Sequence, residues 1–220
     1  ENIGNGLTVL QAPAGFGKTT LLASFAAELD FETRWLTLDA SSAYAEVFAE
    51  QLGRGLVGEA DGWAPAAAIK PEDLKAYLAT AVRTAAESNE RPILLVIDNV
   101  HEVHDAPEAT DLLGWVMETA PEGWEIVLSG RSPAALVEVD RRVASGECLF
   151  LGSTDLAFSS EEIGELLVRQ SHAGLDATRV AEATLGWPVG VMAVLNGMMN
   201  PDIPGAEPQR AAWERYLVAE

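Results

Sequence analysis

Eight residues near the amino terminus have the types and the spacing of a loop that binds phosphate groups. They read Ala12-Pro13-Ala14-Gly15-Phe16-Gly17-Lys18-Thr19, which matches the pattern G-x-x-x-x-G-K-[ST] except at its first position. Glycines allow the positive φ angles that turn backbone N–H groups toward an anion. Lys18 supplies a cation for the β- and γ-phosphates, and Thr19 supplies a hydroxyl for Mg²⁺. The alternative is a glycine-rich turn that binds nothing.

The sequence on either side of the loop favours the phosphate-binding interpretation. The apolar run Leu7–Leu10 before it is typical of a buried strand, and a helical stripe of apolar residues begins after Lys18. Backbone N–H groups and the positive end of that helix would face the phosphates. The predicted nucleotide-binding residues are Ala14, Gly15, Phe16, Gly17, Lys18, Thr19 and Thr20.

An acidic residue follows the most hydrophobic run of the chain. Five aliphatic residues, Ile93–Ile97, lie between Pro92 and Asp98 and predict a strand buried on both faces. Asp98 is therefore a candidate ligand for Mg²⁺, mostly through water, although an aspartate that caps a turn is the alternative. Asn99 stands where many nucleotide-hydrolysing proteins carry a second acid. Because an amide cannot accept a proton from attacking water, we expect slow or absent hydrolysis.

These residues need a framework of strands alternating with helices, and the first part of the chain has that pattern. Strands are predicted at 7–10, 33–38, 93–97, 125–129 and 148–151, and helices from 18, at 44–56, from 71 and at 107–119. The alternation predicts an α/β fold with a mostly parallel sheet flanked by helices, as in P-loop NTPases. The apolar faces of two helices are predicted to comprise Leu21, Leu22, Phe25, Ala26 and Leu29 in one, and Leu74, Tyr77, Leu78, Ala81 and Val82 in the other.

The strand pattern ends near Thr154, and helical patterns follow. Ser159 and Glu162 have the spacing of a capping box, and further helices are predicted at 176–185, at 189–199 and from 208 to the end. We therefore predict an α/β nucleotide-binding domain at 1–154, a small helical subdomain at 155–200, and a linker with the start of a further helix at 201–220. The stretch 61–69 is predicted to be a loop.

The composition limits the classes of partner. The formal net charge is −20, and a field of that sign repels nucleic acid phosphates, so we expect no direct contact with DNA or RNA. No apolar run is long enough to span a membrane. The single cysteine, Cys148, excludes an internal disulfide and favours a reducing compartment such as the cytoplasm. His101 and His104 form an H-x-x-H run that lacks the further ligands of a zinc site.

Five motifs in order resemble the STAND class of signalling NTPases, and most closely the ATPase module of MalT-like, LuxR-type transcription regulators. The motifs lie at 12–22, 95–101, 128–133, 155–162 and 186–190, within a similarity that spans about residues 7 to 199. The resemblance implies that Arg131 is a sensor arginine near the γ-phosphate and that Pro188, in Gly-Trp-Pro, packs on the adenine. A surface arginine and a proline that opens a helix are the alternatives. Asn99 occupies the place of a family acid.

The resemblance implies a regulatory switch that binds ATP or ADP with Mg²⁺. Its partners would be sensor and DNA-binding domains of a longer protein, and it would self-associate in a nucleotide-dependent manner. Two other interpretations stay open. One is an enzyme, either a fast ATPase or a kinase, although no arginine-rich lid is evident beyond Arg141-Arg142. The other is a degenerate scaffold for protein partners, which Asn99 favours.

Overall fold

The computed structural model describes residues 6–58, 69–131, 137–172 and 174–199. The chain divides into two compact units, each described by itself below. The first comprises Glu1–Gln11 and Leu21–Leu151, and the second comprises Ala12–Thr20 and Gly152–Glu220. The loop at residues 12–20 is thus grouped with the carboxyl-terminal helices. The division at residues 154 and 155 stays a prediction, and the predicted linker and helix at 201–220 lie outside the described residues.

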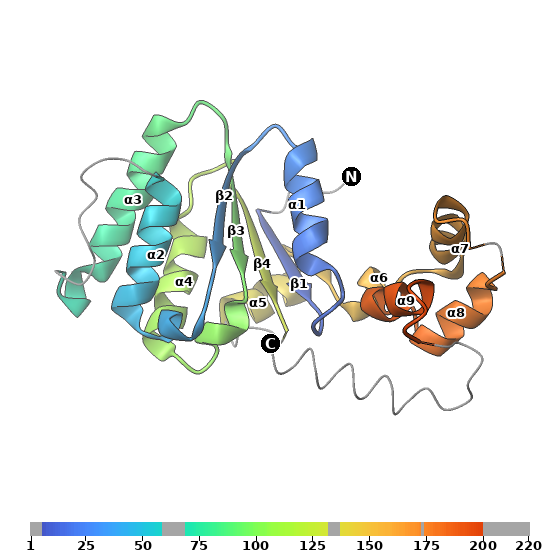
Figure 1. The fold of residues 1–220 in the computed structure, drawn as a ribbon. Helices are drawn as coiled ribbons and strands as arrows, with labels where there is room; N and C mark the ends of the chain where they lie inside the picture. The colour runs from blue at the N-terminus through green and yellow to red at the C-terminus, as the bar shows by residue number, and fades with distance from the viewer. Residues whose placement is uncertain (1–5, 59–68, 132–136, 173, 200–220) are drawn as a thin grey trace. The chain divides into compact units, whose positions relative to one another are not determined.

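The first unit is built on a five-stranded sheet with the strand order β2-β3-β4-β1-β5 (Figure 1). Every neighbouring pair of strands is parallel, which confirms the predicted α/β class. All six residues of β3 and of β4 are buried, as expected for strands covered on both faces. The strands are β1 (Leu7–Gln11), β2 (Glu32–Thr37), β3 (Ile93–Asp98), β4 (Glu125–Gly130) and β5 (Leu149–Leu151).

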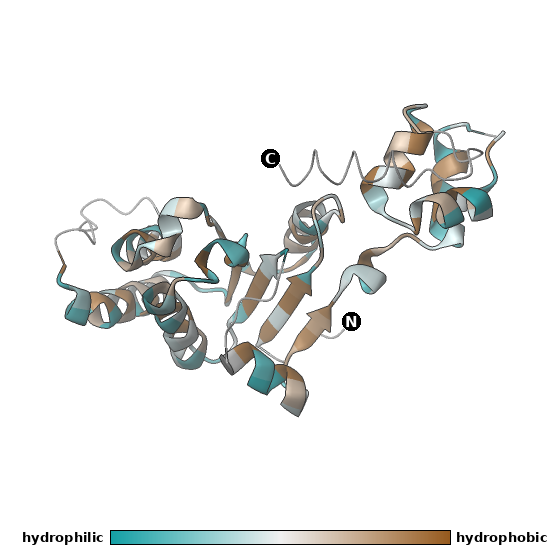
Figure 2. Ribbon diagram, turned by 90° about the horizontal axis from the view of Figure 1, so that it is seen from below, coloured by the Kyte–Doolittle hydropathy of each residue, from teal (hydrophilic) through white to brown (hydrophobic). Residues whose placement is uncertain are grey.

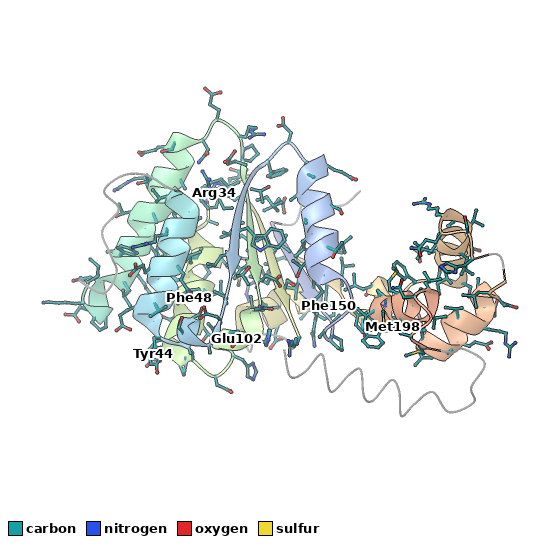
Figure 3. All side chains as sticks on the ribbon, viewed as in Figure 1. Arg34, Tyr44, Phe48, Glu102, Phe150 and Met198 are labelled. Atoms are coloured by element: carbon teal, nitrogen blue, oxygen red, sulfur yellow. The ribbon has the colours of Figure 1, made fainter. Side chains whose placement is uncertain are left out.

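Helices cover the two faces of this sheet, and an apolar core lies under each face. The larger core joins alternate residues of β3 and β4 to α2, α3 and α4, and it contains the fully buried Phe48, labelled in Figure 3. The smaller core joins the intervening residues to α1. Figure 2 shows the strands between these layers as largely hydrophobic. The helices are α1 (Lys18–Glu28), α2 (Ala45–Val57), α3 (Leu74–Ser88), α4 (Pro107–Thr119) and α5 (Val137–Ser145), with short 3₁₀ turns η1 (Ala40–Ala43), η3 (Pro71–Asp73) and η4 (Val100–Val103).

The predicted apolar face of α3 is confirmed, whereas that of α1 is wrong at Leu21. Leu22 is buried, but Leu21 is 43% exposed. At 100° per residue, the row from Leu22 through Phe25, Ala26 and Leu29 forms one stripe, and Leu21 lies at its margin. Helix α5 was not predicted. Four of its nine residues are charged, and these charges hide any apolar stripe; they are Glu138, Asp140, Arg141 and Arg142.

The second unit contains the helices α6 (Ser153–Leu156), α7 (Ser160–Arg169), α8 (Ala177–Thr184) and α9 (Pro188–Leu195). Ile163, Leu167, Val180 and Val191 lie in its apolar core. The predicted capping box is confirmed, since the Ser159 N–H donates to Glu162 Oε2 at 2.8 Å and the Glu162 N–H donates to Ser159 Oγ at 3.2 Å. The bonds that the Glu162 carboxylate accepts from the Ser159 N–H and from the Ser159 hydroxyl lower the pKa of Glu162.

The second unit contains one helix that was not predicted, and the structure corrects the end of another. The one-turn helix α6 was not predicted. The helix predicted at 189–199 ends at Leu195 instead, because Gly197 has a φ of +69°, the left-handed conformation that stops helices. No helix among the residues that the structure describes is long and apolar enough to cross a membrane.

Candidate functional site

Three strands of the first unit end together at the carboxyl edge of the sheet. Asp98, the last residue of β3, is paired with Ser129 of β4, and Gln11, the last residue of β1, is paired with Gly130. The Asp98 side chain is buried at 4% exposure. One of its oxygens, Oδ1, accepts a hydrogen bond of 3.0 Å from the Asn99 backbone N–H. The sheet thus carries a buried carboxylate at the edge where the strand before the glycine-rich loop also ends.

Ser129 is a polar residue of this edge that sequence reasoning missed. Its side chain is fully buried, and its hydroxyl has no hydrogen-bond partner among the described residues. A buried hydroxyl without a partner costs about 1–3 kcal/mol, so such groups commonly serve a ligand or an ordered water. The signals in the sequence were its position at the end of the apolar run Ile126–Leu128 and its place in the motif at 128–133, where no role was assigned to its hydroxyl. A carboxylate beside an unsatisfied hydroxyl fits Mg²⁺ and its water ligands, which are bound by oxygen.

Asn99 has a conformation that accounts for its residue type. Its backbone is left-handed, with φ 61° and ψ 37°, a region where asparagine and aspartate are enriched. Its side-chain Nδ2 donates to the Leu38 carbonyl oxygen at 3.4 Å. The 3₁₀ turn η4, with His101 and Glu102, follows directly. Asparagine therefore suits the backbone at this position, and an aspartate would suit it as well.

The glycine-rich loop lies in the second unit and has the backbone form expected of a phosphate-binding loop. Gly15 and Gly17 have φ angles of +79° and +74°, which only glycine adopts at low cost. Lys18 is the first residue of α1, so the loop ends at a helix amino terminus. The Lys18 ammonium donates to the carbonyl oxygens of Ala12 at 2.7 Å and Pro13 at 3.1 Å.

The other predicted binding residues flank the loop within the second unit. Thr19 and Thr20 are in the first turn of α1 and are exposed, and Ala14 and Phe16 are half-buried. Pro188 is the first residue of α9, a position whose N–H makes no hydrogen bond within the helix, so a proline fits there. The next residue along, Val189, donates its backbone N–H to the Gly15 carbonyl oxygen at 3.2 Å. The start of α9 and the loop are therefore directly hydrogen-bonded.

Two further residues, Arg131 and Cys148, belong to the first unit. Arg131 is exposed and directly follows β4, and residues 132–136 lie outside the described part of the chain. Burial raises the pKa of the half-buried Cys148 thiol, which disfavours the thiolate that a nucleophile needs. Within the described ranges, no group of three or more His, Cys, Asp or Glu side chains has the arrangement of a metal site.

One of three similar solved structures supports the fold, and the other two have TM-scores below 0.5. The Aeropyrum pernix ORC1 protein, solved in complex with DNA, superposes with a TM-score of 0.52 at 15% identity over 96% of this chain and 60% of that protein. Drosophila ORC bound to DNA gives 0.48 at 18% identity over 83% and 46%. C. elegans PCH-2 gives 0.42 at 14% identity over 77% and 40%. This chain therefore spans less than two thirds of each protein.

Comparison with protein families gives a more direct assignment. Residues 2–135 match the AAA domain family, which is more than half of the 220-residue chain. The matched range contains the glycine-rich loop, β1 to β4 and the carboxyl edge with Asp98 and Ser129. The chain belongs to the AAA domain family and has the helix-flanked parallel sheet of the P-loop NTPases.

Proposed function

We propose that this chain binds Mg-ATP and Mg-ADP as a regulatory switch and hydrolyses ATP slowly or not at all. The observation that carries the proposal is the connection from β1 to α1, where two left-handed glycines precede a lysine at a helix amino terminus. Membership in the AAA domain family implies the same ligand class. Backbone N–H groups and a helix amino terminus are suited to phosphate, which is the part common to both nucleotides.

In this proposal each residue of the site has a separate task. The N–H groups from Ala14 to Thr20 receive the phosphates, Lys18 adds a positive charge, and Thr19 and Asp98 hold Mg²⁺ with its waters. The metal ion would neutralise charge on the phosphate oxygens. Resemblance to STAND regulators adds Arg131 as the sensor of the γ-phosphate and Pro188 as the contact to the adenine. The buried Ser129 hydroxyl is available to a water of the metal.

The regulatory part of the proposal depends on the family resemblance and on Asn99. A nucleotide can move a conformational equilibrium only by its differential affinity for the two states. Slow turnover keeps ATP bound long enough for that difference to act, and Asn99 lacks the acid–base capacity that fast hydrolysis uses. The switch would act on sensor and DNA-binding domains of a longer cytoplasmic transcription regulator and would control self-association.

Direct binding of nucleic acid is not part of the proposal. Although the Aeropyrum pernix protein was solved with DNA, the net charge of −20 disfavours binding to a phosphate backbone by this chain. The scaffold alternative is also favoured by Asn99, whereas a kinase would need an acceptor and turn over at about 1–100 per second. Fast phosphate release from Mg-ATP would identify an ATPase, and ADP formation that requires an acceptor would identify a kinase.

Hydrogen–deuterium exchange tests the switch. The experiment compares the chain with Mg-ADP and with a non-hydrolysable Mg-ATP analogue, using Lys18→Ala as the matched control. We expect the two nucleotides to give different protection in α7, α8 and α9, and no nucleotide-dependent protection in Lys18→Ala. Equal protection by both nucleotides in the wild-type chain would contradict a switch and leave a plain nucleotide-binding scaffold.

A further inference from the structure

Trp187 is a buried tryptophan whose contacts lead to the glycine-rich loop. It is 5% exposed and is the residue before the first turn of α9. Its indole Nε1–H donates to the Ala14 carbonyl oxygen at 3.2 Å, across 173 positions of sequence. It is not a member of the apolar cluster formed by Ile163, Val180 and Val191. The indole is thus buried against the loop, within the unit that contains both.

Two glycines leave the space that the indole occupies. A Cβ atom built on Gly15 would come within 2.9 Å of Trp187 Nε1 and of Val189 Cγ2. A Cβ atom built on Gly190 would come within 2.8 Å of Trp187 Cε3. Real Cβ atoms do not approach side chains this closely. Gly15 is therefore needed for this contact as well as for its positive φ.

The hydrogen bonds to the loop determine the direction of two of its amides. In a planar trans peptide the C=O and the following N–H point in opposite directions. Trp187 binds the Ala14 carbonyl and Val189 binds the Gly15 carbonyl, so both carbonyls face α9. The N–H groups of Gly15 and Phe16 must then point away from α9. Both amides belong to the stretch that receives phosphates in the proposed function.

We propose that Trp187 is a positioning residue for phosphate binding, which holds the Gly15 amide in its binding orientation through the Ala14 carbonyl, next to the Val189 bond that orients the Phe16 amide. The inference rests on the proposed function, because it concerns the same site. Coupling between two groups is reciprocal. A nucleotide that fixes the loop therefore also strengthens the bond to Trp187, and the start of α9 responds to occupancy of the loop.

The first test uses Trp187→Phe, which keeps an aromatic ring and removes the N–H donor. Trp115→Phe is the matched control, because Trp115 is a half-buried tryptophan on α4. Titration calorimetry with Mg-ADP is carried out on the wild-type chain, both variants and Lys18→Ala. We expect the Kd of Trp187→Phe to rise about tenfold, as loss of a net hydrogen bond predicts, with Trp115→Phe unchanged.

A second measurement is made on the wild-type chain and does not depend on whether a variant folds. The chain has six tryptophans, whose indole N–H groups give separate cross-peaks in a ¹⁵N correlation spectrum. The Trp187 peak is assigned by its absence in Trp187→Phe, or by its proximity to Gly15 and Gly190 if that variant does not fold. We expect Mg-ADP to shift this peak and to slow exchange of its hydrogen with solvent. A purely structural tryptophan would show no slowing of this exchange, because a shift alone reports only that the bound nucleotide is near.

The outcomes separate the inference from the proposed function. If the wild-type chain binds Mg-ADP, Lys18→Ala does not, and Trp187→Phe binds as tightly as the wild type, the inference is overturned and nucleotide binding stands. An indole peak whose hydrogen exchange Mg-ADP leaves unchanged overturns it in the same way. If the wild-type chain neither binds Mg-ADP nor carries bound nucleotide, the proposed function is overturned and the inference with it.

Discussion

Asp98 and Ser129 are directly paired residues of the adjacent parallel strands β3 and β4, and both side chains are buried at the carboxyl edge of the sheet. Paired residues of neighbouring strands lie on the same face of a sheet. The pair thus places a carboxylate and an unsatisfied hydroxyl side by side on one face. Two buried polar groups that directly follow the aliphatic runs Ile93–Ile97 and Ile126–Leu128 make this edge suited to a ligand rather than to packing alone.

Ser129→Ala should separate stability from function. The substitution removes a hydroxyl that has no partner among the described residues, so the free energy of unfolding should stay the same or rise by about 1 kcal/mol. The affinity for Mg-ADP should fall, because the proposed metal site loses the Ser129 hydroxyl oxygen. Urea denaturation and calorimetric titration give the two quantities.

Ser42→Ala is the matched control for this prediction. Ser42 is also fully buried, but its hydroxyl donates to Gln51 Oε1 at 2.7 Å and accepts from the Asp39 N–H at 3.0 Å. Its removal should lower the free energy of unfolding by about 1–3 kcal/mol. A loss of stability in Ser129→Ala as large as that in Ser42→Ala would contradict the interpretation of Ser129 as a ligand-directed hydroxyl.

The fold was predictable from sequence where local residue patterns mark the start and the end of a helix or strand. The strand Ile93–Asp98 begins after Pro92 and consists of five aliphatic residues before its aspartate, and helix Pro107–Thr119 has a proline at its first position. Both ranges were predicted to within one residue. Helix α5 was missed because four of its nine residues are charged. Local sequence patterns predict helices and strands because hydrophobic periodicity and helix caps are local properties.

The candidate site was predictable only in part, for a related reason. The glycine-rich loop and Asp98 have sequence patterns of their own, whereas Ser129 matters only through the strand register that pairs it with Asp98. Trp187 matters through a bond to Ala14 that spans 173 positions. Relationships of this kind arise from tertiary packing, which no short window of sequence contains.

Asn99→Asp should raise the rate of ATP hydrolysis. Aspartate tolerates the left-handed backbone at this position, where φ is 61°, and it adds the acid–base group that the proposed switch lacks. General acid–base groups contribute about 10²–10⁴-fold, so an increase of at least about tenfold in kcat is expected. Phosphate release is the measurement. Asn99→Gly keeps the backbone without the carboxylate, and an equal rate in both variants would show that position 99 does not limit turnover.

Glu125→Gln should stabilise the first unit at neutral pH. Burial raises the pKa of Glu125, with the Gly6 N–H bond acting in the opposite direction. A raised folded pKa means that the folded chain binds the proton more tightly, so wild-type stability falls as pH rises from 4.5, the ordinary value, through the raised value. The glutamine variant lacks this loss. Its gain in the free energy of unfolding over the wild type should be complete at pH values above the raised pKa of Glu125. The gain should vanish at pH values below 4.5.

Chemical denaturation across a pH series measures this difference. Glu122→Gln, at an exposed position three residues earlier, removes the same charge without the burial and serves as the control. If Glu125→Gln behaved like Glu122→Gln across the series, burial of Glu125 would not be the origin of the pH dependence.

Nucleotide binding by the wild-type chain and Lys18→Ala tests the central proposal most directly. A sample of each protein is first denatured and assayed for released nucleotide, and calorimetric titrations with Mg-ADP and Mg-ATP follow. We predict bound or titratable nucleotide in the wild-type chain and loss of both in Lys18→Ala, because the lysine supplies the cation of the phosphate-binding loop. A wild-type chain that carries no nucleotide and binds neither ligand, or a Lys18→Ala variant that binds as tightly as the wild type, would contradict the account.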